Sequence, residues 1–263
     1  MAKKYNHKNK ASNRGDIVKH IFLYLLRGCI YKYADVHSGY YSYSLSNEFN
    51  RFKKMASGLD LDGYFKAQSN GYLSSHALMK HFNPCSLVMY LFDICSEVTD
   101  SLRQEYAAWD EIHIFNYAAT KLEIAKYRPE FVLLDPPGFK SKSNPKYPCV
   151  TDDILPLLES VFELQHSSAM MWIPLTKSLS EKRMIPSEAC QNNVSLLGDA
   201  LCDEMVAFSV DFKDWNQAIG TFIGCNIYLS SNMYKYANKE GIDLFGKMSE
   251  ICMAVGWDFK RLF

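Results

Sequence analysis

The stretch FVLLDPPGF, residues 131–139, ends an apolar run with a carboxylate and two prolines. Proline fixes its own φ and restricts the residue before it, so Asp135 and the carbonyl of Pro136 form two adjacent acceptors on a stiff corner. Such a pair suits an exocyclic amine like adenine N6, which must be oriented toward an electrophile and then lose a proton. The alternative is that the prolines only end a strand. The strand pattern before them favours the chemical interpretation.

Polar residues also follow three other strand-like runs. They are Asp35 with His37, then Asp93, then Asn116 with Tyr117. In an open parallel sheet, ligands bind beyond the carboxyl ends of the strands, because the loops there diverge. Polar groups at four successive strand ends are what the ribose, base and amino-acid parts of a nucleoside-like ligand require.

Two of these strand ends have specific interpretations. Asp93 is placed to accept both hydroxyls of a ribose, but an N-cap of the next helix explains it equally well. Gly39 would let the backbone approach a ligand closely, whereas a lone glycine after a strand more often marks a plain turn.

Three further polar residues are candidates with ordinary structural alternatives. His20 and His37 could hydrogen-bond a carboxylate or a base edge, although a lone histidine is more often structural. Ser75 stands where a helix begins, and capping that helix is its simplest role.

The elements that must position these residues follow from the hydrophobic pattern. Asp16 caps or begins a helix whose apolar residues have helical spacing, and Gly28 suits its end. Strand patterns alternate with helical patterns, which predicts a parallel sheet covered on both faces. The strand patterns occupy residues 29–35, 86–93, 111–116, 130–135 and 168–175.

The last part of the chain has a different pattern. Residues 204–212 and 221–229 are strand-like and are joined by a segment too short for a helical crossover, which predicts an antiparallel edge hairpin. A final helix is expected near residues 243–255. The whole outline resembles that of an α/β, Rossmann-like class I methyltransferase, and we expect a mostly parallel seven-stranded sheet. Residues 44–71 are expected to form a small helical insertion after the first strand.

Composition limits the possible functions. The chain has 263 residues, is 48% hydrophobic, and carries 29 basic and 29 acidic residues, so contact with a polyanion has to be local. Its eight cysteines show no C-x-x-C pair or zinc spacing, and we expect buried thiols and no metal. No segment is apolar and long enough to span a membrane. We therefore expect a cytoplasmic, monomeric protein with a single domain over residues 1–263 and a basic N-terminal segment at residues 1–15.

The chain resembles a known family in its N-terminal segment. The bacterial large-subunit ribosomal RNA adenine-N6 methyltransferases of the J type have the pattern Y-x-H-x-x-H-x-G-N-x-x-D-x-x-K-H. Six of these eight positions match here. The corresponding residues are Tyr5, His7, Lys10, Ser12, Asn13, Asp16, Lys19 and His20. Four later segments of the chain also resemble sequence blocks of this family. They are DVHSGYY from Asp35, YLSSH from Tyr72, YLFD ending at Asp93 and DPPG from Asp135.

The resemblance implies a function and a set of site residues. S-adenosylmethionine would be the cofactor, nucleic acid the substrate with RNA favoured over DNA, and Asp135 the catalytic residue. The implied cofactor-binding residues are Lys19, His20, His37, Gly39, Ser75, Asp93, Asn116 and Tyr117. The implied substrate-binding residues are Tyr5, His7, Pro136 and Phe139.

The sequence departs from the family at several positions. Gly138 replaces the aromatic residue that stacks on the target base, and Phe139 is the obvious substitute. Tyr41 replaces a glycine, and Ser74 and His76 replace glycine and proline. Two alternatives therefore remain beside adenine N6: methyl transfer to another base atom, as the D-P-P-x-F form of the motif suggests, or a catalytically silent binding subunit with a methyltransferase fold.

Overall fold

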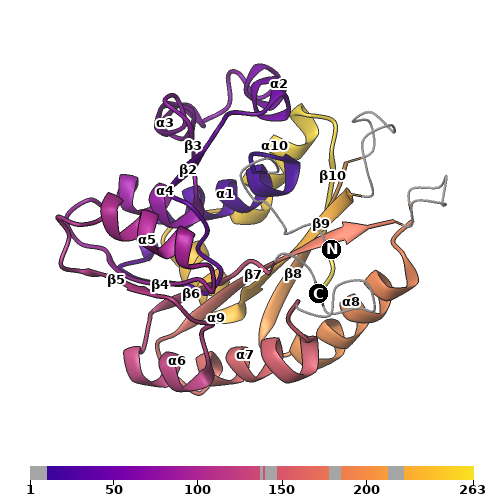
Figure 1. Cartoon of the computed structure of the whole chain (residues 1–263). Coiled ribbons are helices and arrows are strands. Elements are labelled where there is room, and N and C mark those ends of the chain that lie inside the picture. Colours follow the sequence, from indigo (N-terminus) through magenta and orange to yellow (C-terminus); the bar gives the residue numbers. More distant parts are fainter. Residues whose placement is uncertain (1–10, 137–138, 140–146, 178–184, 213–221) are drawn as a thin grey trace, which may run out of the picture. The chain divides into compact units, whose positions relative to one another are not determined.

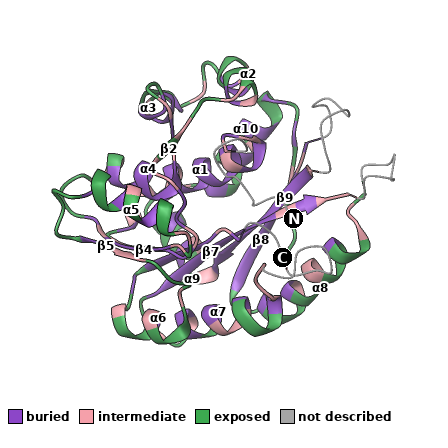
Figure 2. Ribbon diagram, in the orientation of Figure 1, coloured by how far each residue is buried: buried purple, intermediate pink, exposed green. Residues whose placement is uncertain are grey.

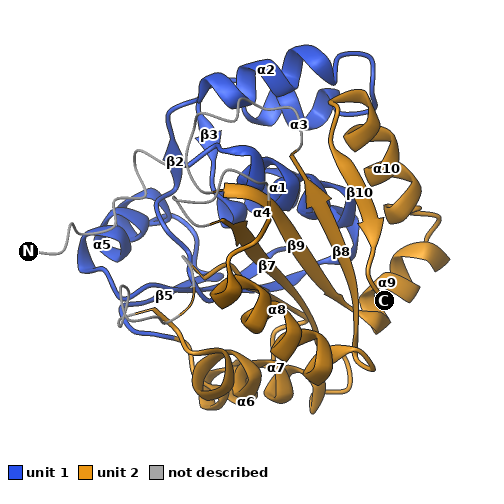
Figure 3. Cartoon of the chain, turned by 90° about the vertical axis from the view of Figure 1, so that its right-hand side faces the viewer, with its two compact units in different colours: residues 1–118 blue, residues 119–263 orange. Residues whose placement is uncertain are grey.

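The computed structural model describes residues 11–136, 139, 147–177, 185–212 and 222–263 (Figure 1). The chain divides into two compact units, Met1–Ala118 and Ala119–Phe263 (Figure 3). In both units most strands are buried and most helices have an exposed face, whereas the helix Arg14–Leu26 is almost entirely buried (Figure 2). No described helix is long and apolar enough to cross a membrane.

Unit 1 contains helices and strands in alternation. Its helices are α1 (Arg14–Leu26), the 3-10 turn η2 (Arg27–Cys29), α2 (Asn47–Met55), α3 (Asp62–Ala67), α4 (Ser75–Phe82) and α5 (Ser96–Glu105). Its strands are β1 (Lys32–Asp35), β2 (Ser42–Tyr43), β3 (Tyr72–Leu73), β4 (Val88–Phe92) and β5 (Ile112–Phe115).

Strands β1, β4 and β5 form the parallel part of unit 1. Asp35 is opposite Leu91 and Phe92 is opposite Phe115, so all three strands end at the same edge. Apolar residues such as Tyr33 and Leu91 are fully buried there, as expected for parallel strands covered on both faces. The edge where these strands end is where the polar residues predicted above are located.

The helical insertion predicted for residues 44–71 is confirmed. It consists of α2 and α3, and the short antiparallel pair β2 and β3 flanks it. Phe49 of α2 packs edge-on against Tyr64 of α3 and against Tyr72 of β3, at ring distances of 6.1 and 5.4 Å. Buried aromatic rings thus form the core of the insertion, which explains why a short segment can fold on the side of a sheet.

Helix α1 begins differently from the prediction. Its N-cap is Asn13, and Asp16 is the third residue of the helix. The two residues form a capping box, in which each side chain accepts a hydrogen bond from the backbone of the other residue. Ser12 precedes the cap with a left-handed φ of 62°. The helix ends at Leu26 rather than at Gly28.

Unit 2 holds the remaining elements. Its helices are α6 (Lys121–Tyr127), the π-helical turn η3 (Val150–Ile154), α7 (Leu155–Phe162), α8 (Glu188–Leu201), α9 (Ser231–Lys239) and α10 (Leu244–Ala254). Its strands are β6 (Phe131–Leu134), β7 (Ser168–Thr176), β8 (Met205–Asp211), β9 (Phe222–Ser230) and β10 (Asp258–Arg261).

The strands of unit 2 combine both kinds of pairing. Strand β6 pairs in parallel with β7, as the long connection between them requires. Strands β7, β9, β8 and β10 then pair antiparallel in that order. The predicted antiparallel hairpin is therefore present as β8 and β9, and the predicted final helix is α10.

The predicted α/β class, with parallel strands and an antiparallel edge hairpin, is confirmed. Within the described residues, β1 and β4 to β10 make eight strands rather than the expected seven. The additional strand is β10, which lacks the predicted apolar alternation because three of its four residues are charged. The expectation that the cysteines are buried is wrong for Cys85 and Cys202, which are exposed.

Candidate functional site

The turn after β1 is built around a buried carboxylate. Asp35, 1% exposed, accepts a hydrogen bond of 3.1 Å from the hydroxyl of Tyr33 and one of 3.2 Å from the backbone N–H of His37. The hydroxyl of Ser38 donates to the carbonyl of Asp35 at 3.0 Å. Asp35 therefore shapes the turn that the sequence predicts as a ligand-binding loop.

Gly39 and Asp93 are brought together at the ends of neighbouring strands. The N–H of Gly39 donates to Oδ2 of Asp93 at 3.1 Å, and the N–H of Cys95 donates to Oδ1 at 2.8 Å. The N–H of Ser38 donates to the carbonyl of Phe92 at 3.0 Å. Each carboxylate oxygen keeps lone pairs beyond these bonds, so Asp93 can accept further donors from a ligand.

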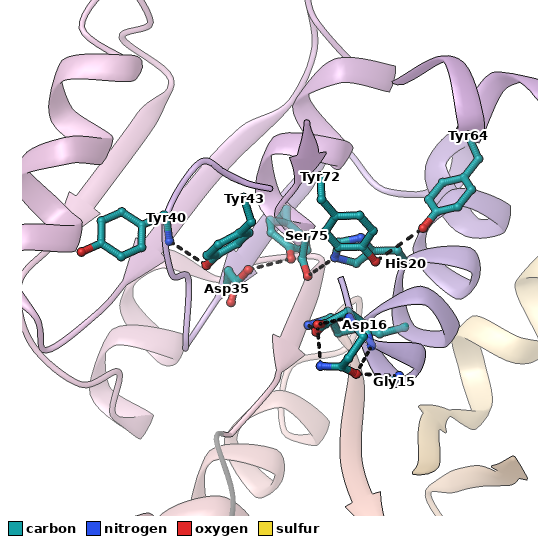
Figure 4. A network of polar contacts seen from close by, with 12 residues as sticks. Gly15, Asp16, His20, Asp35, Tyr40, Tyr43, Tyr64, Tyr72 and Ser75 are labelled. Atoms are coloured by element: carbon teal, nitrogen blue, oxygen red, sulfur yellow. Dashed lines mark hydrogen bonds and ion pairs between the residues drawn. The ribbon is translucent and has the colours of Figure 1, made fainter. Parts of the chain in front are cut away.

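The space next to Gly39 is occupied by a tyrosine of unit 1. Gly39 has a φ of +67°, and the hydroxyl of Tyr43 lies directly where a side chain on Gly39 would begin. The same hydroxyl accepts the N–H of Tyr40 at 2.9 Å (Figure 4). A side chain at residue 39 would therefore adopt a strained φ and would have to displace the Tyr43 hydroxyl.

The end of β5 completes this edge. The side-chain amide of Asn116 donates to the carbonyl of Asp93 at 3.3 Å. The ring of Tyr117 is 43% exposed and packs edge-on against Phe92 at 6.0 Å. Ile94, which the sequence analysis did not single out, is 75% exposed beside Asp93. Two exposed apolar side chains therefore flank two hydrogen-bonding groups, a combination that suits a flat heterocycle.

His20 and Ser75 meet in the interior of unit 1. Nε2 of His20 lies 3.2 Å from the hydroxyl of Ser75, and the imidazole stacks on the ring of Tyr72 at 4.9 Å (Figure 4). His20 is 2% exposed, and its Nδ1 has no hydrogen-bond partner among the described residues. Burial and the positive charge of Lys19 hold the pKa of His20 well below its usual value of 6.5, so the imidazole is neutral.

Ser75 is not the helix cap that its position suggests. The N-cap of α4 is Ser74, whose hydroxyl accepts the N–H of Ala77. Ser75 is the first helical residue, and its hydroxyl is directed at His20. Adjacent serines made the two roles indistinguishable from sequence.

Lys19 is buried in an ion pair. Its ammonium group lies 3.3 Å from Oδ1 of Asp16, and its side chain is 5% exposed. The matching motif positions Asn13, Asp16 and Lys19 therefore form the start of α1. The Lys19 ammonium group is thus engaged with Asp16 within the first turns of that helix.

One buried chain of polar groups was missed entirely. Nε2 of His76 lies 2.8 Å from the hydroxyl of Ser74, and its Nδ1 lies 2.9 Å from the hydroxyl of Tyr106. Burial lowers the pKa of His76 to about 3, against the opposing effect of the nearby peptide groups of Gly39, Ser38 and Tyr40. No sequence motif predicts the contact between His76 and Tyr106, because these two residues are 30 positions apart.

The motif of unit 2 lies at a strand end, as predicted. Asp135 follows the last residue of β6 and is half-buried, and Pro136 is buried. Phe139 is half-buried. Pro137, Gly138, and the predicted substrate residues Tyr5 and His7 lie outside the described residues.

Comparison with known proteins supports the fold. The chain is similar to the protein LPL1258 from Legionella pneumophila, which is assigned to the family DUF519, with a TM-score of 0.69 and 12% identity over 95% of this chain and 97% of that chain. At such low identity the similarity shows a shared fold. No protein-family model matches the chain. No curated protein matches it either.

Weaker similarities include named methyltransferases. One is a SAM-dependent methyltransferase from Agrobacterium tumefaciens, with a TM-score of 0.44 and 10% identity over 82% of this chain and 61% of that chain. Another is an rRNA methylase from Streptococcus thermophilus, with a TM-score of 0.42 and 10% identity over 83% of this chain and 96% of that chain. Both scores are below 0.5, so the functional argument depends on the residues.

Proposed function

We propose that the protein is an S-adenosylmethionine-dependent methyltransferase that acts on adenine N6 in nucleic acid, with ribosomal RNA as the favoured substrate. The observation that supports it best is the hydrogen bond between Gly39 and Asp93. It joins the glycine turn of one parallel strand to the acid at the end of the next, as in folds that bind nucleosides at this edge.

Unit 1 supplies the residues for the cofactor. The lone pairs that Asp93 retains suit the two hydroxyls of a ribose. Ile94 and Tyr117 offer apolar surface for the adenine ring, and Asn116 offers a polar edge beside them. These residue types fit the nucleoside half of S-adenosylmethionine. Once bound, the cofactor supplies a methyl group that is already activated by its sulfonium.

His20 fits the amino-acid half of the cofactor. Its Nδ1 is buried and has no partner in the part of the chain that the structure describes, and leaving such a group unsatisfied costs about 1–3 kcal/mol. Because Nε2 faces a hydroxyl, the neutral ring can present Nδ1 as a donor to a carboxylate or as an acceptor to an ammonium group. His20 and Ser75 thereby remain candidates from the motif, whereas Lys19 acts through Asp16.

Unit 2 supplies the residues for the amine. Asp135 and the carbonyl of Pro136 are adjacent acceptors held by the proline ring. In the proposed reaction they would orient the two N6 hydrogens, the cofactor would supply the methyl group to the nitrogen, and Asp135 or water would take the proton that the amine releases.

The target base has to be accessible for this chemistry. An adenine in a duplex would have to leave its stack, and a single-stranded base is presented at lower cost. Phe139 is proposed, on the sequence motif, to stack on it, a contact worth about 1–3 kcal/mol. Tyr5 and His7 are proposed, on the motif alone, to contact the same base.

Two measurements, made one after the other, test the proposal. Titration calorimetry with S-adenosylhomocysteine should show binding, and the absence of heat at millimolar ligand would overturn the proposal. Methyl transfer from labelled cofactor to ribosomal RNA should then be followed by mass spectrometry of the nucleosides. N6-methyladenosine is the expected product. Another methylated base would move the target atom, and cofactor binding without any transfer would favour a non-catalytic binding subunit.

A further inference from the structure

The turn that follows β1 is fixed by more than its own hydrogen bonds. The N–H groups of Ser38, Gly39 and Tyr40 donate to Phe92, Asp93 and Tyr43 respectively. All three donors are therefore engaged on the side of β4 and β2.

The start of α4 is bonded to the end of this turn. The N–H of Ser74 donates to the carbonyl of Tyr41 at 2.9 Å. His76 is 0% exposed, and its Nε2 lies 2.8 Å from the hydroxyl of the same Ser74. The imidazole is therefore linked to the backbone of the turn through Ser74.

The hydrogen bonds of His76 engage both ring nitrogens. The hydroxyl of Ser74 accepts the N–H of Ala77 and faces Nε2 of His76. The hydroxyl of Tyr106 faces Nδ1. Since a hydroxyl can donate or accept, these two partners satisfy a neutral imidazole in either tautomer.

Tyr106 connects this chain to the end of α5. It is the C-cap residue of that helix, and its ring packs edge-on against His76 at 5.8 Å and against Tyr41 at 5.5 Å. Its hydroxyl thus contacts the imidazole, while its ring contacts Tyr41 at the end of the turn. Three segments distant in sequence converge on one short piece of backbone.

We propose that His76 and Tyr106 are positioning residues that hold the backbone of the turn Ser38–Tyr41 in the conformation that receives the cofactor. This inference rests on the proposed function, because it assigns these residues to the same cofactor site. Neither residue touches the reacting atoms. They act through the placement of Gly39 and of Asp93, which accepts its N–H.

Three variants and a matched control test this role. Tyr106→Phe removes one oxygen and leaves Nδ1 of His76 without this hydrogen-bond partner. His76→Leu removes both hydrogen bonds, and His76→Gln keeps one donor and one acceptor. His81 is the control, because it lies in the same helix α4 but is exposed. The full-length chain is used throughout, with folding checked by circular dichroism.

The readouts separate positioning from stability. Tyr106→Phe and His76→Leu should weaken S-adenosylhomocysteine binding about tenfold, which is what an unsatisfied buried polar group predicts, and should shift the amide resonance of Gly39. His76→Gln should recover most of the affinity, and His81→Gln should bind like the unchanged protein. Should His76→Leu fail to fold, Tyr106→Phe gives the same comparison.

The possible failures are distinguishable. If the unchanged protein shows no heat with the ligand, the proposed function fails and this inference fails with it. If the unchanged protein binds and Tyr106→Phe binds equally well with an unmoved Gly39 resonance, only this inference is overturned. A lower unfolding temperature with unchanged affinity would also overturn it, since that result describes a purely structural role.

Discussion

The N–H of Gly39 donates a 3.1 Å hydrogen bond to Oδ2 of Asp93, which is 54 residues away in the sequence. This bond ties the turn after β1 to the end of β4, so the shape of the turn and the direction of the carboxylate are set together. A change at either residue is therefore expected to alter both the stability of unit 1 and the proposed cofactor site.

Gly39→Ala should destabilise the protein strongly. An alanine at a φ of +67° costs about 1–2 kcal/mol, and its Cβ would overlap the hydroxyl of Tyr43, which adds about 1–3 kcal/mol. Gly58→Ala is the matched control, because Gly58 also has a positive φ of +94° but nothing lies within 4 Å of an added Cβ. Chemical denaturation should show the larger loss for Gly39→Ala.

The steric part of this prediction can be isolated. In a Tyr43→Phe background the obstructing hydroxyl is absent, so Gly39→Ala should cost no more than Gly58→Ala does. An equal penalty in both backgrounds would show that the tyrosine does not restrict this position.

Asp93→Asn should weaken binding of the proposed cofactor. Its two oxygens accept the N–H groups of Gly39 and Cys95, and an asparagine would oppose one of these donors with its own amide hydrogens. A lost charged hydrogen bond is worth about 1.5–3 kcal/mol, so calorimetry should find about 10- to 100-fold weaker S-adenosylhomocysteine binding. Asp100→Asn, at an exposed position of α5, should leave the affinity unchanged.

The sequence was sufficient to predict the residues at the strand ends. Apolar runs that end in Asp35, Asp93 and Asn116 correspond to β1, β4 and β5, and parallel pairing brings their ends to one edge. A strand-terminal acid is recognisable because an apolar run and a carboxylate are both local features. The start of α1 was recognisable for the same reason, although the cap is three residues earlier than Asp16.

Contacts between distant segments could not be predicted in this way. Tyr43 and Tyr106 were not singled out from the sequence, because nothing local indicates that their hydroxyls bond to a turn and to a histidine. His76 stood out only as a departure from a motif. Strand β10 was missed because an exposed edge strand needs no apolar alternation.

Ser12 provides a test of backbone strain. It has a φ of 62°, where the resembling family has glycine, and its hydroxyl accepts the N–H of Ser46 at 2.8 Å. Both variants lose the hydroxyl. Ser12→Ala keeps the strained φ, whereas the glycine of Ser12→Gly adopts this φ without strain. Denaturation should therefore find Ser12→Ala less stable than Ser12→Gly by about 1 kcal/mol. The reverse order would mean that the left-handed backbone at this position is not strained.

Stability should fall in mild acid because of buried neutral histidines. The pKa of His76 is lowered from 6.5 to about 3, so between these values the unfolded chain binds a proton that the folded chain excludes. His20 contributes in the same direction. The contribution is complete above pH 6.5 and is lost as the pH falls toward 3, with a slope approaching about 1.4 kcal/mol per pH unit for each histidine.

The slope of stability against pH, measured in two variants, shows whether His76 causes this loss of stability. Urea denaturation should be repeated with His76→Gln and with the exposed control His81→Gln. The first variant should flatten the pH dependence and the second should not. Parallel curves for the unchanged protein and His76→Gln would contradict a neutral buried His76.

Asp135 should separate cofactor binding from methyl transfer. It follows β6 and is proposed to contact the target amine and not the cofactor, so Asp135→Ala and Asp135→Asn should keep S-adenosylhomocysteine affinity within about twofold. Both variants remove the carboxylate that accepts the proton, and general-base groups contribute about 10²- to 10⁴-fold, so transfer should fall by that factor. Asp203→Asn, which changes an exposed acid elsewhere in unit 2, should keep full activity.

Asn offers an acceptor to the amine but takes no proton, so Asp135→Asn should exceed Asp135→Ala in residual rate if orientation of the amine contributes separately. Single-turnover transfer to ribosomal RNA at saturating cofactor measures both rates, and undiminished transfer by Asp135→Ala would remove this carboxylate from the reaction.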